Sequence, residues 1–334
     1  MSSVWGNKIK VSIFGESHGK SIGVVLDGVP SGVLIDFDNI LLQMKRRAPG
    51  NNEFSTQRKE QDFPIIQSGL LNNRTTGFPI CAIIENKSAH SNDYENLKNT
   101  PRPGHSDYTA FLKYNGFADM RGGGHFSGRL TAPLVFAGAI CSQILEKQGI
   151  FINANIIEIA GIKNNESFIS DEIKDAINKA MEDGDSVGGI IECTVEGVNN
   201  PIGSPIFNSV EANLSSIIFS IPAVKGIEFG AGFNSSKMRG SECNDEFYIK
   251  NNKVATKTNN CGGILGGIAN GMPIVFRVAF KPTPSIKKEQ STVDLTKNCE
   301  CKIEINGRHD PCIVPRALPV VEAVCAIAIL DLML

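Results

Sequence analysis

Residues 11–19 read Val11-Ser12-Ile13-Phe14-Gly15-Glu16-Ser17-His18-Gly19, so an apolar run typical of a strand ends on a histidine between two glycines. Glycine allows a positive φ and lets the backbone approach a ligand closely. Ser17 and His18 add a hydroxyl and an imidazole that titrates near neutral pH. Any strand can end on glycine and a polar residue, but this chain has five histidines in 334 residues. We therefore interpret residues 15–19 as a functional strand end.

The sequence on either side predicts a chain of mixed strands and helices. Alternation over residues 8–14 and the apolar run 22–26 indicate two strands joined by a turn. Asp36 or Asp38 is a candidate N-cap for a helix over residues 39–47, which Pro49-Gly50 ends. Residues 86–128 show little periodicity, and so long an irregular segment is usually functional. Further predicted helices span residues 134–147, 170–183, 209–219 and 317–334, and further predicted strands span residues 80–85 and 188–198.

Two similar segments indicate a possible internal repeat. Asp27-Gly28-Val29 and Glu196-Gly197-Val198 each follow a predicted strand and precede a Pro/Gly loop and a helix. Two pseudo-symmetric halves and coincidence are equally good explanations of this similarity. No Pro/Ser linker or charge run divides the chain, so we expect residues 1–334 to form a single domain.

The composition excludes several classes of protein. A net charge of −2 and 7% aromatic residues argue against a nucleic-acid partner. Nine cysteines at irregular spacing predict reduced thiols, and the N-terminus lacks a signal-peptide pattern, so we expect a cytoplasmic protein. Glu322 and Asp331 interrupt the apolar stretch 317–334, which predicts a buried helix and not a membrane span.

Arginine, glycine and histidine recur together in the remaining motifs. Residues 102–108 read Arg-Pro-Gly-His-Ser-Asp-Tyr, and residues 121–129 read Arg-Gly-Gly-Gly-His-Phe-Ser-Gly-Arg. Residues 281–285 read Lys-Pro-Thr-Pro-Ser, and residues 307–312 read Gly-Arg-His-Asp-Pro-Cys. A single arginine is usually a solvated cation, but this repeated pattern indicates a small polyanionic ligand held by charge-assisted hydrogen bonds. Consecutive glycines before a helix further predict an anion-binding nest.

Other functions fit the motifs less well. Ser127 replaces the third glycine of a dinucleotide fingerprint, and no phosphate-loop lysine follows the glycines as a small-molecule kinase would require. A hydrolase built from Ser17, His18 and Asp310 lacks the nucleophile elbow and leaves the arginines unexplained. Zinc is disfavoured because Cys312 and its neighbours have no second ligand pair at suitable spacing. A non-enzymatic anion-binding protein would not need two histidines beside glycines.

Taken together, the motifs closely resemble the chorismate synthase family, in order and from the first strand to the last helix. The motifs that carry this resemblance are residues 15–19, 102–108, 121–124, 222–226, 262–267, 281–283 and 307–312.

The resemblance implies a reaction, a cofactor and an assembly. The reaction is a 1,4-elimination of phosphate from 5-enolpyruvylshikimate-3-phosphate to give chorismate, with reduced FMN and no net redox change. The implied fold is an α+β fold, a β-α-β sandwich of antiparallel sheets with helices between them, assembled as a homotetramer. NADPH enters only as a possible reductant of the flavin, and we expect an external flavin reductant because no reductase insertion is visible.

The resemblance also assigns roles to residues. His18 resembles the acid that protonates the departing phosphate, and His105 the group that protonates the reduced flavin. Asp310, with Ser17 and Ser127 as relay, resembles the base that prepares flavin N5. The implied substrate-binding residues are Arg47, Arg102, Arg129 and Arg308. The implied flavin-binding residues are His125, Phe126, Ser127, Pro222, Ala223, Gly266, Lys281, Pro282, Thr283, Pro284, Ser285 and Arg308.

Three positions depart from the family pattern. Many members have Arg-Ser-Ser at residues 125–127, so Phe126 can contact a ligand only by its backbone or by stacking. Many members have an arginine near the position of Glu53. A glutamate there would repel the negative charges of the substrate and of any NADPH phosphate. Pro222 replaces an amide residue, which leaves a backbone contact.

Overall fold

The computed structural model describes residues 3–50, 62–87, 99–166, 168–305 and 310–334. Two five-stranded sheets, with strand orders β1-β2-β3-β7-β4 and β11-β16-β10-β8-β9, dominate the fold. Every adjacent pair in them is antiparallel. Their strands are β1 (Val4–Trp5), β2 (Lys10–Gly15), β3 (Ser21–Asp27), β4 (Pro64–Ser68), β7 (Ile80–Glu85), β8 (Phe151–Ile159), β9 (Ile162–Lys163), β10 (Gly189–Glu196), β11 (Val224–Phe229) and β16 (Ile274–Phe280).

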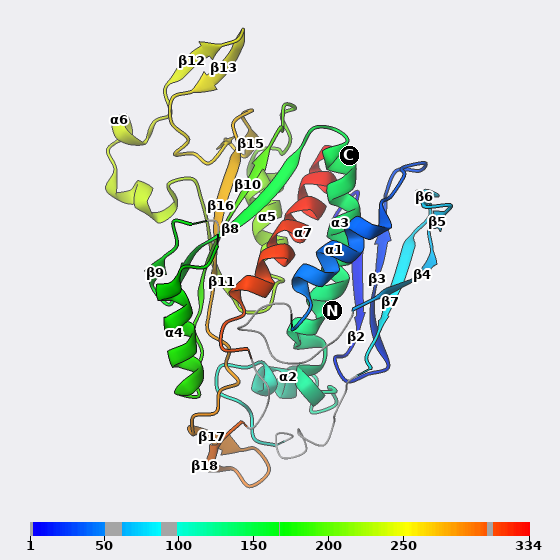
Figure 1. Cartoon of the computed structure of the whole chain (residues 1–334), viewed down its shortest axis with the longest axis vertical. Coiled ribbons are helices and arrows are strands. Elements are labelled where there is room, and N and C mark those ends of the chain that lie inside the picture. The colour runs from blue at the N-terminus through cyan, green and yellow to red at the C-terminus, as the bar shows by residue number, and fades with distance from the viewer. Residues whose placement is uncertain (1–2, 51–61, 88–98, 167, 306–309) are drawn as a thin grey trace.

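Helices occupy the space between the two sheets in the view of Figure 1. The helix α3 (Thr131–Glu146) packs on the first sheet through β2, β3 and β7, and α7 (Val314–Met333) packs on the second through β8 and β10. The two helices also pack on each other. The other helices are α1 (Phe37–Arg47), α2 (Asp107–Lys113), α4 (Asp171–Glu182), α5 (Val210–Ile218) and α6 (Gly240–Cys243).

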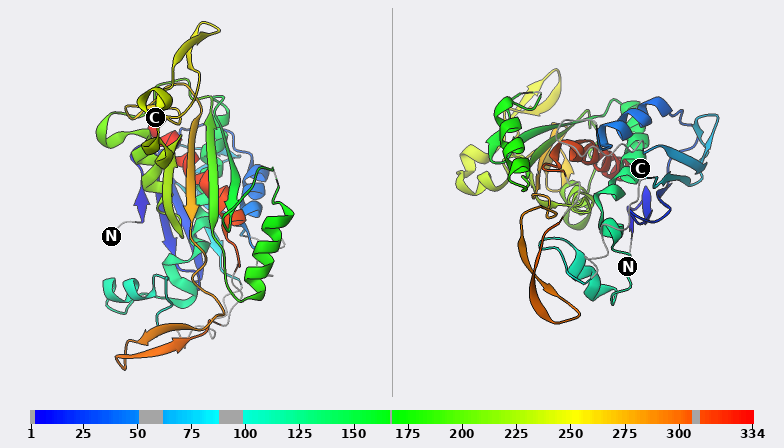
Figure 2. Two further views of the ribbon diagram at one scale, coloured as in Figure 1. Left: turned by 90° about the vertical axis from the view of Figure 1, so that its left-hand side faces the viewer. Right: turned by 60° about the horizontal axis from the view of Figure 1, so that its bottom comes forward.

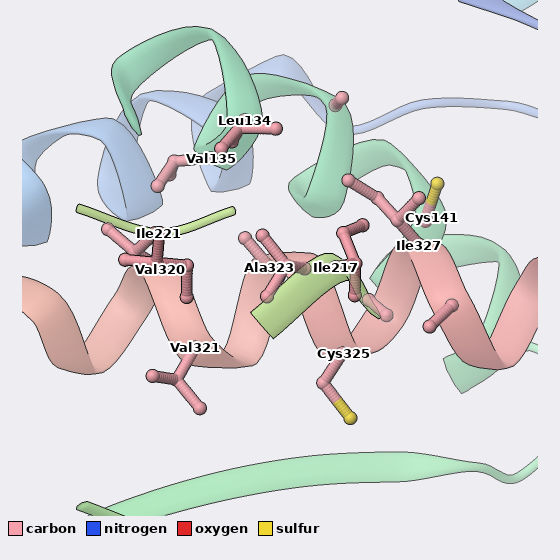
Figure 3. Packing of buried hydrophobic residues seen from close by; sticks show 14 of the residues in the cluster. Leu134, Val135, Cys141, Ile217, Ile221, Val320, Val321, Ala323, Cys325 and Ile327 are labelled. Carbon is pink, nitrogen blue, oxygen red and sulfur yellow. The ribbon is translucent and has the colours of Figure 1, made fainter. Parts of the chain in front are cut away.

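The contact between α3 and α7 forms the centre of the core. A Cβ on Gly138 of α3 would lie 2.4 Å from the Cα of Ala323 on α7, so the backbones meet where both side chains are small. Figure 3 shows Val320 and Ala323 pointing towards α3, whereas Val321 and Cys325 point to the opposite side. Burial on both faces agrees with the predominantly apolar sequence of α7 and confirms the predicted buried C-terminal helix.

The apolar stretch 121–146 is long and apolar enough to cross a membrane by length and composition. However, 89% of its most apolar window is buried inside the structure. It is therefore a core helix that packs against α7 and the first sheet.

Most predicted elements are confirmed, including the strands on both sides of residues 15–19. Asp36 is the N-cap of α1 and accepts from the backbone N–H of Asp38 and Asn39. The sequence analysis missed α2, which lies within the segment expected to be irregular, as well as β4, β8, β11 and β16. It also missed four hairpins, β5 (Leu70–Leu71) with β6 (Arg74–Thr75), β12 (Phe247–Lys250) with β13 (Lys253–Thr256), β14 (Ile264–Leu265) with β15 (Ile268–Ala269), and β17 (Gln290–Asp294) with β18 (Cys299–Ile303).

The two segments that suggested an internal repeat have the same local geometry. Gly28 follows β3 with φ 86°, and Gly197 follows β10 with φ 85°. A Cβ would lie 1.9 Å from the carbonyl oxygen of Lys8 in the first case and 2.0 Å from that of Gly149 in the second. Both glycines are thus required where a sheet partner passes closely. The equivalence of the two halves stays a prediction.

Asp331 in the last turn of α7 fixes the chain that leads into β2. Its Oδ1 accepts from the backbone N–H groups of Asn7, Lys8 and Ile9 at 3.0, 2.6 and 2.7 Å. We expect Asp331→Ala to lower the free energy of unfolding by about 3 kcal/mol, because it leaves these donors without their acceptor. Denaturant unfolding measures the loss. Asp171→Ala, at a carboxylate whose side chain is 94% exposed, is the control and should change stability by no more than about 0.5 kcal/mol.

Candidate active site

A cavity of about 610 Å³ lies where segments far apart in the sequence converge. Its walls come from the chain before α2, the glycine segment 121–129, the α5–β11 connection, the chain after β16 and the first turns of α7. Figure 2 shows α2 and the β17–β18 hairpin together at this end of the molecule. The Thr292 hydroxyl joins them by donating to the carbonyl of Pro101 at 2.6 Å. The volume is in the range of small-molecule sites.

The strand end at residues 15–19 lies against the glycine segment. The Ser17 N–H donates to the carbonyl of Gly124 at 3.2 Å, and the Ser17 hydroxyl lies 3.2 and 3.1 Å from the carbonyl oxygens of Arg121 and Gly122. The His18 Nδ1 is 3.3 Å from the Ser17 Oγ, and both side chains are buried. Ser17 and His18 are thus held as neighbours against the glycine segment, and the expected relay role of Ser17 stays a prediction.

Two successive glycines separate His18 from the second histidine. A Cβ on Gly122 would lie 1.9 Å from Cε1 and 2.0 Å from Nδ1 of His18. A Cβ on Gly123 would lie 3.4 Å from Nε2 of His105. The backbone between them has φ 60° and 91°. Residues 122–123 therefore bring two imidazoles together that are 87 positions apart in the sequence, since their numbers are 18 and 105.

Gly122→Ala should displace His18, because the new methyl group overlaps the ring. We expect turnover to fall by about 10²-fold or more, which is the effect of misplacing a positioned acid, while the fold is retained. Steady-state kinetics and thermal unfolding measure the two effects. Gly149→Ala is the matched control, since Gly149 also has a positive φ (77°) but no atom within 4 Å of the added Cβ. Normal turnover in Gly122→Ala would show that the position of His18 is unimportant.

The anion nest expected at residues 121–129 stays a prediction, although one of its N–H groups is used within the protein. The Gly123 N–H donates to the carbonyl of Met120 at 2.9 Å. Arg121 turns away to a pair with Asp119, with 2.6 Å between Nη2 and Oδ2. The segment also provides close packing for the histidines, because its lack of side chains leaves room for both rings.

Two of the predicted substrate arginines share one buried carboxylate. Arg47 Nη1 and Arg129 Nη1 each lie 2.7 Å from an oxygen of Asp62, whose side chain is fully buried. Burial lowers the pKa of Arg47 to about 10, and the attraction of Asp62 opposes this while the cations of Arg316 and Arg129 add to it. Asp62 thus holds two like charges side by side at the cavity wall.

The other cavity arginines are also paired with buried carboxylates. Arg102 Nε donates to Asp107 at 2.7 Å, and Arg316 Nη1 donates to Asp310. Arg316 Nε also donates to the carbonyl of Arg47 at 3.1 Å, which links the last helix to α1. These arginines are therefore fixed in place before any ligand arrives, so they lose little conformational freedom on binding.

The structure brings most of the predicted residues to one cavity. Arg47, Arg102, Arg129, His105, Ser127 and Asp310 line it, and so do the flavin-binding candidates His125, Phe126, Pro222, Ala223, Lys281, Thr283, Pro284 and Ser285. Ser17 and His18 lie behind the wall residue Gly122. Pro282 and Gly266 are not among the lining residues, and Gly266 lies in the turn between β14 and β15. Arg308 and Glu53 lie outside the described residues.

The structure adds Asp62, Asp107 and Lys225 to the site predicted from the sequence, and it places Arg316, one of the arginines that indicate a polyanionic ligand, on the cavity wall. Asp62 and Asp107 hold the arginines, and Arg316 and Lys225 add positive charge to the cavity. Asp107 follows His105 by two residues in the motif at 102–108, and this spacing is a sequence signal for a carboxylate beside the histidine. Asp62 has no such signal, because its partners Arg47 and Arg129 are distant in the sequence.

The cavity suits a ligand set with several negative charges. Arg47, Arg102, Arg129 and Arg316 line it together with Lys225 and Lys281, and the two lysines are close enough to repel each other. Burial lowers the pKa of Lys281, and the neighbouring Lys225 lowers it further. A nearby anion would relieve this repulsion. The donor set therefore fits both a phosphorylated dicarboxylate and the phosphate of a flavin mononucleotide.

A metal centre is not evident in the part of the chain that the structure describes. Among those residues, no three His, Cys, Asp or Glu side chains gather in a group that could hold an ion. His309, the ligand candidate beside Cys312, lies outside them.

Comparison with known proteins gives a consistent result. A family model described as chorismate synthase matches residues 9–334. Proteins named chorismate synthase from Dehalococcoides mccartyi and Pyrococcus abyssi are 46% and 48% identical to this chain. The alignments cover 100% and 98% of this chain and 97% and 96% of those proteins. A crystal structure of chorismate synthase superposes with a TM-score of 0.76 at 27% identity, over 98% of this chain and 92% of that one.

Proposed function

This chain belongs to the chorismate synthase family, and we propose that the cavity beside its two histidines carries out the elimination. The observation that carries the proposal is the position of residues 122–123 between His18 and His105, at the edge of a cavity with four prepositioned arginines. A substrate with one phosphate and two carboxylates matches these cations in charge. The two imidazoles beside residues 122–123 supply nitrogens that can donate and accept protons.

The arginines bind and orient the substrate in this proposal. Arg47 and Arg129 form one cationic pair through Asp62, and Arg102 forms a second site through Asp107. Planar guanidinium groups with fixed orientation favour bidentate contacts with phosphate and carboxylate oxygens. We infer that His18 donates a proton to the departing phosphate and that Asp310, which lines the cavity, acts as a base.

Reduced FMN is the proposed cofactor. Lys281 and the hydroxyls of Thr283 and Ser285 would hold its phosphate and ribityl chain, and Phe126 and Ala223 would contact its ring. When bound, reduced FMN would lend electron density to the elimination and recover it, so no net oxidation would occur. We infer that His105 exchanges a proton with the flavin in this part of the cavity. An external reductant supplies the reduced state, with NADPH as an alternative source.

The proposal also covers the domain organisation, the type of fold, the assembly and the location of the protein. We infer one domain over residues 1–334, folded as a β-α-β sandwich in which α3 and α7 form the inner layer. The contacts of α3 with the first sheet and of α7 with the second support this description. A homotetramer in the cytoplasm is the assembly and location proposed for it.

The test combines purified protein, 5-enolpyruvylshikimate-3-phosphate, FMN and dithionite without oxygen. We expect chorismate and one equivalent of phosphate, and no product when dithionite is left out. NADPH in place of dithionite tests whether the protein reduces its own flavin. ATP-dependent phosphorylation without chorismate would favour a kinase, and anion binding without turnover would favour a binding protein. Either result would overturn the proposal.

A further inference from the structure

Asp107 forms a second contact beyond its pair with Arg102. Its Oδ1 lies 2.7 Å from Nδ1 of His105, and both side chains are largely buried. The carboxylate is in the first turn of α2, two residues after the histidine, so the start of the helix fixes their spacing. His105 lines the cavity, and its Nε2 faces Gly123 on the opposite side of the ring.

Donors already fill every acceptor direction of this carboxylate. The Oδ2 accepts from the backbone N–H and the Nε of Arg102 at 3.0 and 2.7 Å. The Oδ1 accepts from Arg102 Nη2 at 2.8 Å and faces His105 Nδ1 at 2.7 Å. Burial raises the pKa of Asp107, but hydrogen bonds from Arg102 and His105 outweigh this and hold the pKa well below its ordinary value. The group is thus an ionised acceptor without a proton to donate.

The geometry decides which nitrogen of His105 carries the proton. If Nδ1 had a bare lone pair, two acceptors would face each other at 2.7 Å, which is unfavourable. Arg102 Nη2 is also within 3.1 Å of Nδ1, but it has the closer carboxylate oxygen as its acceptor. Nδ1 therefore donates to Asp107, and Nε2 is the nitrogen that exchanges protons with the cavity.

We propose that Asp107 is a positioning residue that fixes the tautomer of His105, so that Nε2 is available to the bound ligands. This inference rests on the proposed function of His105. It gives Asp107 two linked tasks, because the same carboxylate orients a substrate-binding arginine and a proton-exchanging histidine. A shift of the carboxylate would disturb both groups together.

Asp107→Asn is the decisive variant, because the hydrogen bonds from Arg102 predict which tautomer of His105 it will favour. An asparagine must direct its oxygen to the two Arg102 donors now on Oδ2, since its amide nitrogen cannot accept them. Its NH₂ group then faces Nδ1 of His105 and donates to it, while Arg102 Nη2 loses its acceptor on Oδ1. The variant should thus reverse the tautomer to Nε2–H while it keeps the shape of the site. The same exchange in a serine-protease triad lowers kcat by about 10⁴-fold through a wrong tautomer.

Solid-state ¹⁵N NMR of histidine-labelled full-length protein reads the tautomer without any ligand. In alkaline buffer, where free histidine is neutral, we expect the wild-type ring to have a protonated Nδ1 and a bare Nε2. We expect the reverse in Asp107→Asn. The signal missing from His105→Gln identifies His105 among the five histidines of the chain. Asp119→Asn is the matched control, since Asp119 pairs with Arg121 and not with His105, and should leave the signal unchanged.

Kinetics separates the two tasks of Asp107. We expect kcat of Asp107→Asn to fall by about 10²–10⁴-fold. Ser285→Ala removes a 3.3 Å partner of Arg102 on the other side. It should raise KM for the substrate and leave the tautomer unchanged. A wild-type ring with a protonated Nε2 and a bare Nδ1 overturns the proposal, and so does an unchanged tautomer in Asp107→Asn. A wild-type protein that makes no chorismate instead overturns the proposed function, whatever the tautomer.

Discussion

Replacing either His18 or His105 by alanine should lower turnover by about 10²–10⁴-fold, the usual contribution of a positioned proton donor. Both imidazoles contact the glycine segment at the edge of the cavity, and His105 lines the cavity itself. Removing a ring leaves the arginines and their carboxylates in place, so substrate affinity should change much less. Anaerobic steady-state kinetics with dithionite-reduced FMN measures kcat and KM separately.

A double-mutant cycle makes this prediction sharper. Gly122→Ala acts mainly through its overlap with the His18 ring, which a Cβ would approach to 1.9 Å, while the Ser17 Oγ would lie 3.0 Å away. In a His18→Ala background the overlap is absent, so adding Gly122→Ala should cost almost nothing further. Unchanged thermal unfolding serves as the control for folding in each variant. Wild-type turnover in both histidine variants would exclude the proton-transfer roles.

Asp310→Asn should lower turnover far more than it weakens substrate binding. Asp310 is 7% exposed, lines the cavity and accepts from Arg316. Neutralising a carboxylate in a site for anions should, if anything, favour binding of a polyanion. The retained negative charge is explained if Asp310 takes up a proton during the elimination. Asparagine keeps the shape of the side chain and removes the base, so the effect falls on kcat.

The ion pair between Asp310 and Arg316 offers a competing explanation for a defect in Asp310→Asn. If Asp310 only orients this arginine, Arg316→Lys should reproduce the defect of Asp310→Asn, because it keeps the cation and loses the planar fork. If Asp310 is the base, Arg316→Lys should mainly raise KM. The deciding measurement is single-turnover product formation by enzyme saturated with substrate, beside an equilibrium titration. A saturated Asp310→Asn complex that reacts at the normal rate would leave Asp310 with an orienting role only.

The sequence by itself determined the local elements of this protein and its family. Alternation around residues 11–14 and the Asp36 cap predicted β2 and α1, because strand and helix periodicity depend on neighbouring residues. The ordered motifs with His18, His105 and Asp310 indicated the chorismate synthase family, which the full-length matches confirm. Short strands such as β11 and the hairpins were missed, because tertiary contacts stabilise them more than any local pattern does.

Only the tertiary structure decided how the charges of the site are paired and how its histidines are held. Arg47, Arg129 and Asp62 come from separate segments, and no spacing in the sequence links them. The glycines at 122–123 resemble an anion nest, and their neighbours also make them the packing surface for two imidazoles. The physical reason is that buried ion pairs and close contacts depend on distances between remote segments, and folding fixes these distances only when the sheets and helices have packed together.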